Sequence, residues 1–230
     1  IVTQAPERIQ DLISWGVRFD EANGNLDLNR EGAHSHRRIL HREDQTGREI
    51  QQRLLQRAKN SSHIQFLENH FVVDLITNRE WDPKDLSPLA CWGAKVMDKT
   101  DSQVYALRAD HVVLATGGAG KVFLYTSNWS GASGDGVALA FRAGCRVSNL
   151  EFTQFHPTAL YHSEAPTFLI SEALRGEGGV LVDHQGRPFM KDYDSRASLG
   201  SRDIVARGID EKKKKTGAPC VFLDMTAFDK

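Results

Sequence analysis

One segment, HVVLATGGAG at residues 111–120, constrains the possible folds more than any other part of the chain. Its valines favour a strand, and the glycines that follow let the backbone approach something flat or charged because they lack a Cβ. Nucleotide ligands bind at such strand ends in open α/β sheets. The alternative is a buried strand followed by a tight turn, and this segment alone does not decide between the two.

The composition describes an ordinary globular chain. At roughly 150 residues per domain, a length of 230 residues gives one large domain or one and a half. The chain is 40% hydrophobic and 26% charged, which is too apolar for a disordered protein. A net charge of -1 argues against a general nucleic-acid or anionic-membrane binder, and no apolar run approaches the length of a spanning helix. Three scattered cysteines predict a reducing compartment, and we expect a cytoplasmic location.

At both ends of the sequence, a predicted secondary-structure element lies close to the terminus. Ile1 is not an initiator residue, and residues 7–18 already have the apolar spacing of a helix. The apolar run at 221–226 is typical of a strand, but the sequence offers it no evident partner. We therefore expect an interior piece of a longer protein.

Periodicity predicts an α/β pattern up to about residue 149 and an α+β pattern over 150–230. Turn residues follow the first helix at 23–29. The predicted helices after that turn are 46–59, 133–144 and 202–215. Strands are predicted within 63–77, at 90–98 and at 103–117, with a loop at 78–90.

Two polar residues stand out beside turns. Asp135 in SGDGVALA precedes a helix, where it could cap orphan N–H groups or hold a ribose or ribityl hydroxyl. His156 is followed by Pro157, which fixes the direction of the imidazole; a satisfied core histidine and a catalytic histidine are both open.

Three charged residues complete the set. Glu172 and Arg175 are close enough in sequence to pair on one helical turn, as a structural ion pair or as part of a site. Arg202 lies at a predicted helix N-terminus, where a cation is unfavourable, so we expect a compensating anion; a capping arrangement with Asp203 is the alternative. Together with the glycine-rich turn, these residues suit a small dicarboxylate that is oxidised beside a flavin.

At this point the chain resembles the succinate dehydrogenase/fumarate reductase flavoprotein superfamily. The segments ATGGAG, SGDGVALA, EFTQFHPTAL, SEALRGEGG and SRDIVARGID occur in the order of that superfamily, and REGAHSHRRILH (30–41) resembles its L-aspartate oxidase branch. The resemblance implies an FAD-binding α/β domain over 1–149 and the start of an α+β capping domain over 150–230. It also implies that the N-terminal dinucleotide motif lies outside this sequence and that the piece alone is inactive.

The resemblance implies a role for each matching residue. Arg202 matches the catalytic arginine, with Glu172 and Arg175 as its proton pathway. His156 and Ser171 match groups that bind a substrate carboxylate, although Ser171 stands where relatives usually have Thr. The matching contacts to noncovalent FAD are Phe71, Val72, Thr116, Gly117, Gly118 and Asp135.

Glu31 distinguishes the branches of the superfamily. In aspartate oxidases a Glu at this place faces the substrate ammonium, whereas the dicarboxylate enzymes have an uncharged residue there; a solvent-exposed loop carboxylate is the alternative. We expect His34, His36 and His41 to serve packing and anion contacts, with no metal site.

The implied reaction is the oxidation of L-aspartate to iminoaspartate with O2 or fumarate as acceptor, the first step of de novo NAD biosynthesis. The implied partners are L-aspartate and other C4 dicarboxylates, with quinolinate synthase as a possible protein partner. A succinate dehydrogenase or fumarate reductase flavoprotein subunit is the first alternative. A binding module that keeps these motifs for structure alone is the second.

Overall fold

A computed structural model of the chain describes residues 1–162, 164 and 167–227. Its internal contacts divide the chain into two compact units. The first unit contains Ile1–Phe66, Gln154–Glu164 and Phe168–Lys230, and the second contains Leu67–Thr153 and Ala165–Thr167. These units show which segments pack together. The division at residue 150 into an FAD-binding domain and a capping domain stays a prediction.

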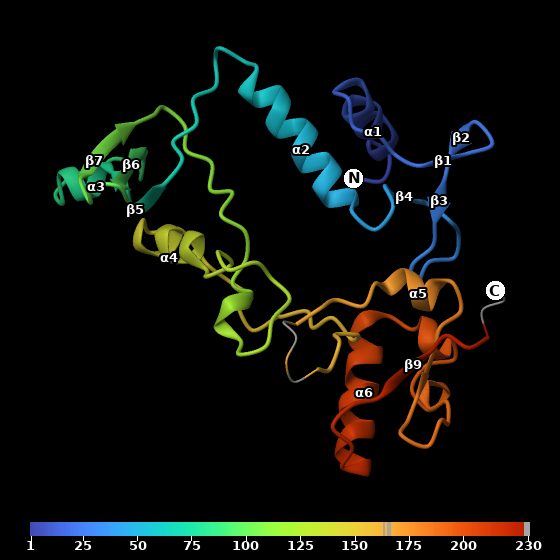
Figure 1. Ribbon diagram of the computed structural model, residues 1–230. Coiled ribbons are helices and arrows are strands. Elements are labelled where there is room, and N and C mark those ends of the chain that lie inside the picture. Colours follow the sequence, from blue (N-terminus) through green and yellow to red (C-terminus); the bar gives the residue numbers. More distant parts are fainter. Residues whose placement is uncertain (163, 165–166, 228–230) are drawn as a thin grey trace. The chain divides into compact units, whose positions relative to one another are not determined.

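The second unit is built on a three-stranded antiparallel sheet (Figure 1). Strands β5 (His70–Thr77), β6 (Cys91–Asp98) and β7 (Val104–Arg108) lie in the order β5-β6-β7. One face is covered by helix α4 (Asp135–Arg142), whose Leu139 packs on Leu75 and Val96. The strands predicted at 90–98 and in the first part of 103–117 are confirmed, and they pair antiparallel.

Two strand predictions in the second unit are wrong. Residues 63–77 are predicted to hold two strands but contain one, β5, and the portion before His70 is irregular. Residues 111–117, predicted as a buried strand, are not in a strand, and Val113 is 86% exposed. A strand needs a neighbour to take up its backbone N–H and C=O groups, and none of the described strands pairs with this segment.

The predicted loop at 78–90 contains one short helix, α3 (Asn78–Trp81). The buried Asn78 organises the rest of it. Its side-chain amide donates to Asp85 (2.8 Å) and Ser87 (2.9 Å), and its side-chain oxygen accepts from the backbone N–H of Ala90 (2.9 Å). These bonds replace the regular backbone pairing that a loop lacks.

The N-terminal part of the first unit consists of two helices and two small hairpins. Helix α1 spans Ala5–Ser14 and helix α2 spans Thr46–Lys59. Strands β1 (Glu21–Ala22) and β2 (Asn25–Leu26) pair across Asn23 and Gly24, which both have positive φ and so suit a two-residue hairpin turn. Strand β3 (Leu28–Asn29) pairs with β4 (Ile39–Leu40). The predicted turn and helix 46–59 are confirmed.

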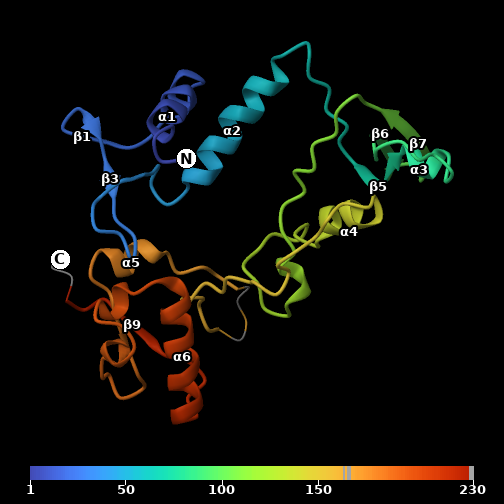
Figure 2. The same ribbon diagram turned by 180° about the vertical axis from the view of Figure 1, so that it is seen from behind.

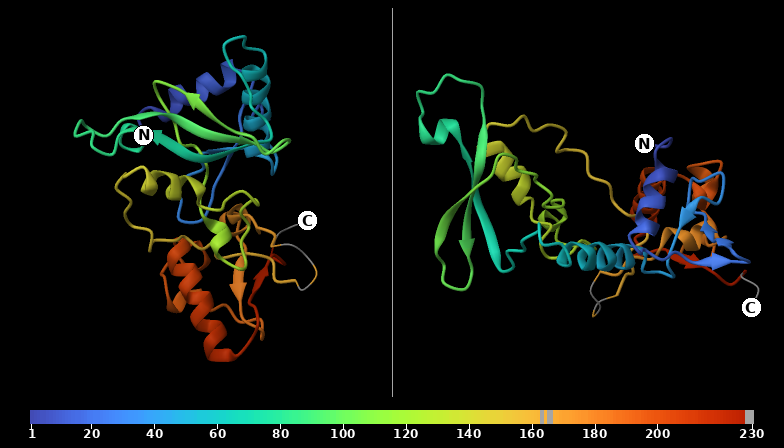
Figure 3. Two further views of the ribbon diagram at one scale, coloured as in Figure 1. Left: turned by 90° about the vertical axis from the view of Figure 1, so that its left-hand side faces the viewer. Right: turned by 90° about the horizontal axis from the view of Figure 1, so that it is seen from above.

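The C-terminal part of the first unit packs a long helix against a small sheet. It contains α5 (Glu172–Gly176), β8 (Val180–Val182), α6 (Arg202–Thr216) and β9 (Phe222–Asp224). Figure 3 shows the two strands side by side next to α6, and their core includes Leu181, Met190 and Val205. The terminal strand has β8 as its antiparallel partner, so the prediction of an unpaired run was wrong. Pairing across 40 residues of chain is not visible as a local pattern.

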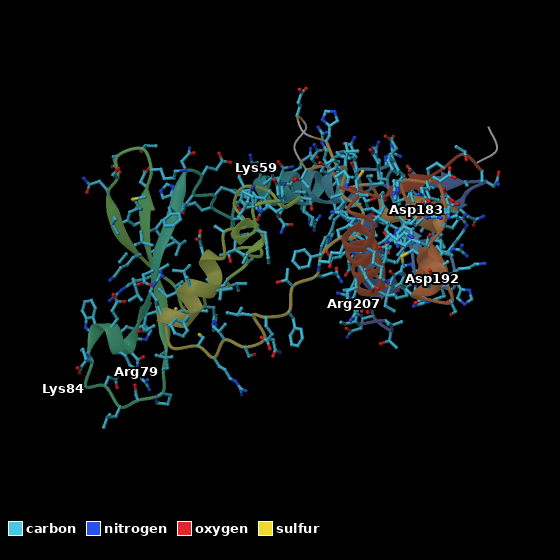
Figure 4. The ribbon with its side chains drawn as sticks, turned by 90° about the horizontal axis from the view of Figure 1, so that it is seen from below. Lys59, Arg79, Lys84, Asp183, Asp192 and Arg207 are labelled. Carbon is cyan, nitrogen blue, oxygen red and sulfur yellow. The ribbon has the colours of Figure 1, made fainter. Side chains whose placement is uncertain are left out.

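Asp183 ties β8 to α6. Its Oδ1 accepts from the backbone N–H groups of Gln185 (2.9 Å) and Arg187 (3.0 Å), and its Oδ2 lies 3.1 Å from Lys212 of α6. Figure 4 labels it among the crowded side chains of the first unit, where it is 2% exposed. The bond from the Arg187 N–H, aided by Lys212, holds the pKa of Asp183 well below its usual range.

Across the described ranges, none of the helices is long and apolar enough to cross a membrane. Cys91, Cys145 and Cys220 are free thiols.

Candidate functional site

The predicted ion pair of Glu172 and Arg175 is the centre of a charged cluster in the first unit. Helix α5 begins after Ser171, whose hydroxyl accepts from the N–H of Ala173 (3.3 Å) and caps the helix. The three-residue spacing then places both side chains on one face, and Arg175 Nη2 donates to Glu172 Oε1 at 2.9 Å. Glu172 is 5% exposed and Arg175 is fully buried.

Arg202 reaches the same carboxylate from α6. As the first residue of that helix it donates from Nε to Glu172 Oε2 at 2.5 Å, and its Nη2 lies 3.9 Å from Glu31 Oε2. Two anions therefore offset a cation at a helix N-terminus, as predicted. Asp203 does not pair with Arg202; it accepts from Ser201 Oγ and pairs with Arg207.

The carboxylate of Glu172 joins a buried guanidinium to a half-exposed one. Arg175 also donates to the carbonyl of Ser198 (2.9 Å), and its buried Nε has no hydrogen-bond partner among the described residues. Burial lowers the pKa of Arg175, while Glu172 opposes that shift. An uninterrupted hydrogen-bonded path thus runs from Arg175 through Glu172 to Arg202, and such a path can relay a proton.

His156 faces this cluster from the segment that enters the first unit. Its Nδ1 accepts from the backbone N–H of Thr158 (3.3 Å), which assigns the proton to Nε2 and leaves that atom as a donor. Burial lowers the pKa of His156, and the positive charge of Arg202 lowers it further. A neutral imidazole donor beside a guanidinium suits the binding of a carboxylate.

Glu31 lies on the connection between β3 and β4. Figure 2 shows the chain after β3 running to α5. Gly32 packs on the side chain of Glu172, where an added Cβ would lie 2.6 Å from Oε1. A Cβ at Gly176 would overlap the carbonyl oxygen of Arg30. Two glycines therefore allow the Glu31 backbone to approach α5 closely.

In the second unit, the structure brings together four of the predicted cofactor residues. The backbone N–H of Gly134, just before α4, donates to the carbonyl of Gly118 (3.2 Å), and the Thr116 hydroxyl fills the space left by Gly136. Gly117 has a φ of +76°, a conformation that favours glycine. Asp135 is the exposed first residue of α4, and the position before the helix is occupied by Gly134, so in the described part of the chain Asp135 is not the capping residue that one interpretation expected.

These groups fit a polar cofactor segment. The 116–118 turn is exposed. The exposed Asp135 carboxylate, at the start of the neighbouring helix, can accept hydrogen bonds from hydroxyl groups. Phe71 and Val72 lie elsewhere in the second unit, on β5, and are 44% and 38% exposed. Among the described residues, no hydrogen bond links them to the 116–118 turn.

The histidine-rich segment has a different arrangement. His41 lies between two carboxylates, with Nδ1 3.3 Å from Asp20 and Nε2 3.2 Å from Asp27. His36 is exposed, whereas Nδ1 of His34 is buried and makes no hydrogen bond in the described part of the chain. No group of three metal-ligating side chains occurs in the described ranges.

Sequence reasoning missed Gln154. Its Oε1 accepts from Arg202 Nη1 at 3.2 Å, so it is a third oxygen around that guanidinium. The signal was available, because Gln154 stands two residues before His156 in the same quoted motif. Alternation along an extended segment puts these two side chains on one side.

Comparisons with known proteins agree with this arrangement. The chain is 49% identical over 233 residues to L-aspartate oxidase of Pseudomonas aeruginosa and 51% identical over 232 residues to that of Vibrio cholerae serotype O1. Each comparison covers 98% of this chain and 43% of the relative, so the chain spans about two fifths of their length. The predicted resemblance to this branch is confirmed.

A solved structure of a mutant E. coli quinol fumarate reductase matches with a TM-score of 0.87 at 28% identity, over 99% of this chain and 40% of that one. A family model described as "FAD binding domain" matches residues 1–230. The predicted α/β FAD-binding fold and the predicted cofactor, FAD, are thereby confirmed. Because this family model matches the whole chain, the chain belongs to the FAD binding domain family.

Proposed function

We propose that this chain is part of an FAD-dependent enzyme that oxidises L-aspartate to iminoaspartate, with O2 or fumarate as acceptor, as the first step of de novo NAD biosynthesis. The observation that carries the proposal is the Glu31 carboxylate, 3.9 Å from the Arg202 guanidinium. A carboxylate there complements an ammonium group and favours aspartate over a substrate that bears only carboxylates. The resemblance to proteins named L-aspartate oxidase supports the same substrate.

The residues of the first unit would divide the binding of aspartate between them. Arg202 and the Nε2–H of His156 donate to the substrate carboxylates, and the Ser171 hydroxyl adds a further donor when it rotates away from its capping bond. Glu31 accepts from the ammonium. Together these contacts to the carboxylates and the ammonium fix the position of the aspartate Cα, the atom that loses its hydrogen.

FAD, when bound, supplies the two-electron acceptor for the reaction. In this proposal Thr116, Gly117, Gly118 and Asp135 hold its polar part, and Phe71 with Val72 contacts its adenine side. Arg202 holds or moves the proton at the reacting carbon in fumarate reduction, and Glu172 passes that proton to and from Arg175. Because an arginine normally stays protonated, the carboxylate between the two guanidiniums is the group that makes transfer feasible.

A flavoprotein subunit of succinate dehydrogenase or fumarate reductase is the second candidate. It is favoured by the similarity to a quinol fumarate reductase, with a TM-score of 0.87. Glu31 disfavours it, since succinate offers no positive charge to this carboxylate. Acid precipitation of the full-length protein separates the two candidates, because the second candidate has FAD attached covalently to a histidine and this proposal has FAD bound noncovalently. We expect the flavin to stay in the supernatant.

The proposal extends to location and partners. We propose a cytoplasmic enzyme that acts on L-aspartate and C4 dicarboxylates. We also propose a quinolinate synthase as the partner that uses its product, iminoaspartate. The test of the function is oxygen uptake by the full-length enzyme with L-aspartate and with succinate. Uptake with aspartate alone supports the proposal, whereas uptake with succinate alone assigns the chain to the dicarboxylate branch.

A further inference from the structure

Residues 30–38, here named the Glu31 loop, connect β3 to β4. The ends of the loop are fixed, because Asn29 pairs with Ile39 and the N–H of Arg38 donates to the carbonyl of Asn29 (3.1 Å). The N–H of His34 also donates to the carbonyl of Glu31 (3.2 Å), which turns the chain back on itself. The loop is therefore closed at its base and tightly turned at its first half.

The first half of the loop is docked beside the charged cluster by two hydrogen bonds to backbone carbonyls. Arg30 Nη2 donates to the carbonyl of Gly176 at 3.1 Å, and the N–H of Ala33 donates to the carbonyl of Leu199 at 2.9 Å. The missing side chain of Gly176 gives the Arg30 carbonyl its place. These contacts hold one side of the loop against the C-terminal end of α5.

The second half of the loop is held by one ion pair. Arg37 Nη2 donates to Glu177 Oε2 at 2.8 Å, with 55% and 35% of the two side chains exposed. The hydrogen bond from Arg37 holds the pKa of Glu177 below its usual value, as expected of a formed pair. Glu177 follows Gly176 directly, so both arms of the loop attach to adjacent residues at the end of α5.

We propose that Arg37 and Glu177 are positioning residues, whose ion pair holds the Glu31 loop on α5 and so fixes the Glu31 carboxylate beside Arg202. This inference rests on the proposed function, because the selectivity it explains is that for an ammonium-bearing substrate. A loosened loop withdraws the anion from the ammonium of aspartate. It leaves the contacts of Arg202 and His156 with a dicarboxylate in place.

The test uses the full-length holoenzyme and measures two constants for each variant: the KM for L-aspartate and the inhibition constant for succinate. In Arg37→Gln and in Glu177→Gln we expect the KM for aspartate to rise about three- to fivefold, as fits the loss of one half-exposed ion pair. The inhibition constant for succinate stays the same or falls. Exchange of the two charges, Arg37→Glu with Glu177→Arg, brings the KM back to within about twofold of the wild type.

Lys214→Gln is the matched control, since it breaks an exposed ion pair with Asp210 (2.7 Å) on α6 far from the loop; both constants should stay at their wild-type values. The inference is overturned if the single variants keep the wild-type ratio of the two constants. It is also overturned if both constants rise together, or if charge exchange gives no recovery. Failure of the proposed function shows differently, as a wild-type enzyme that does not oxidise aspartate.

Discussion

Glu172 is the residue on which the site depends, because its two oxygens bind different arginines. Arg175 on one side is fully buried, while Arg202 on the other is exposed enough to meet a ligand. Removal of the Arg175 guanidinium therefore has a different consequence from removal of the Arg202 guanidinium. Loss of Arg175 leaves a buried charge less well paired, whereas loss of Arg202 removes a group that we propose touches the substrate.

For Arg202→Leu we expect fumarate reduction to fall by about 10²–10⁴-fold, the usual contribution of a positioned acid or base. FAD content should not change, because Arg202 belongs to the first unit and the glycine turn at 116–118 to the second. Steady-state rates and the flavin absorbance of the purified full-length variant measure both quantities. Near-normal reduction of fumarate would remove Arg202 from the mechanism.

His156 gives a prediction about pH. Its pKa is lowered in the folded state, so between that value and the unfolded value of 6.5 the unfolded chain binds more protons. This group therefore makes the fold less stable as pH falls through about 6.5. Thermal unfolding of the full-length enzyme at about pH 5.5 and pH 7.5 should show a smaller difference in Tm for His156→Gln than for wild type. An equal or larger difference in the variant would contradict the assignment.

At the scale of elements, the docking of the β3–β4 turn on α5 depends on glycine. In Gly176→Ala the new methyl group overlaps the Arg30 carbonyl, and we expect a loss of about 1–3 kcal/mol in the free energy of unfolding. Gly47→Ala in α2 is the control. No atom lies within 4 Å of its added Cβ, so that variant should be as stable as wild type or slightly more stable. Equal stabilities for the two alanine variants, measured by urea unfolding, would exclude the close approach.

The elements that sequence predicted best are those with local causes. Helices 46–59, 135–142 and 202–216 carry their own apolar spacing and end signals, including Gly217 with φ of +70° after α6. The strand prediction for 111–117 depended on a sheet neighbour, and the partner of β9 lay 40 residues away. Pairings of this kind are set by the fold and not by the segment.

The candidate site was predictable in composition but not in geometry. Spacing predicted the pairing of Glu172 with Arg175, and electrostatics predicted an anion beside Arg202. The resemblance supplied Glu31 and the substrate-binding role of His156. The resemblance also implied that Glu172 and Arg175 serve Arg202. Neither source predicted that the two oxygens of Glu172 would each bind one arginine, nor that Gln154 would complete the shell of Arg202, because these contacts join three separate segments of the chain.

At the scale of the whole molecule, the two compact units contain different groups of predicted site residues. The charged cluster lies in the first unit, and the glycine turn with Asp135 lies in the second. The relatives named L-aspartate oxidase are more than twice as long as this chain, which covers 43% of them. Activity is therefore a property to measure on the full-length enzyme.

The central claim is that the Glu31 carboxylate selects an ammonium-bearing substrate. Its direct test is anaerobic stopped-flow bleaching of FAD in the full-length enzyme, with L-aspartate and succinate compared in wild type and in Glu31→Gln. The account predicts fast bleaching by aspartate in wild type and a loss of at least about tenfold in the variant, as for one charge-assisted hydrogen bond. Bleaching by succinate in wild type, or unchanged bleaching by aspartate in Glu31→Gln, would contradict it.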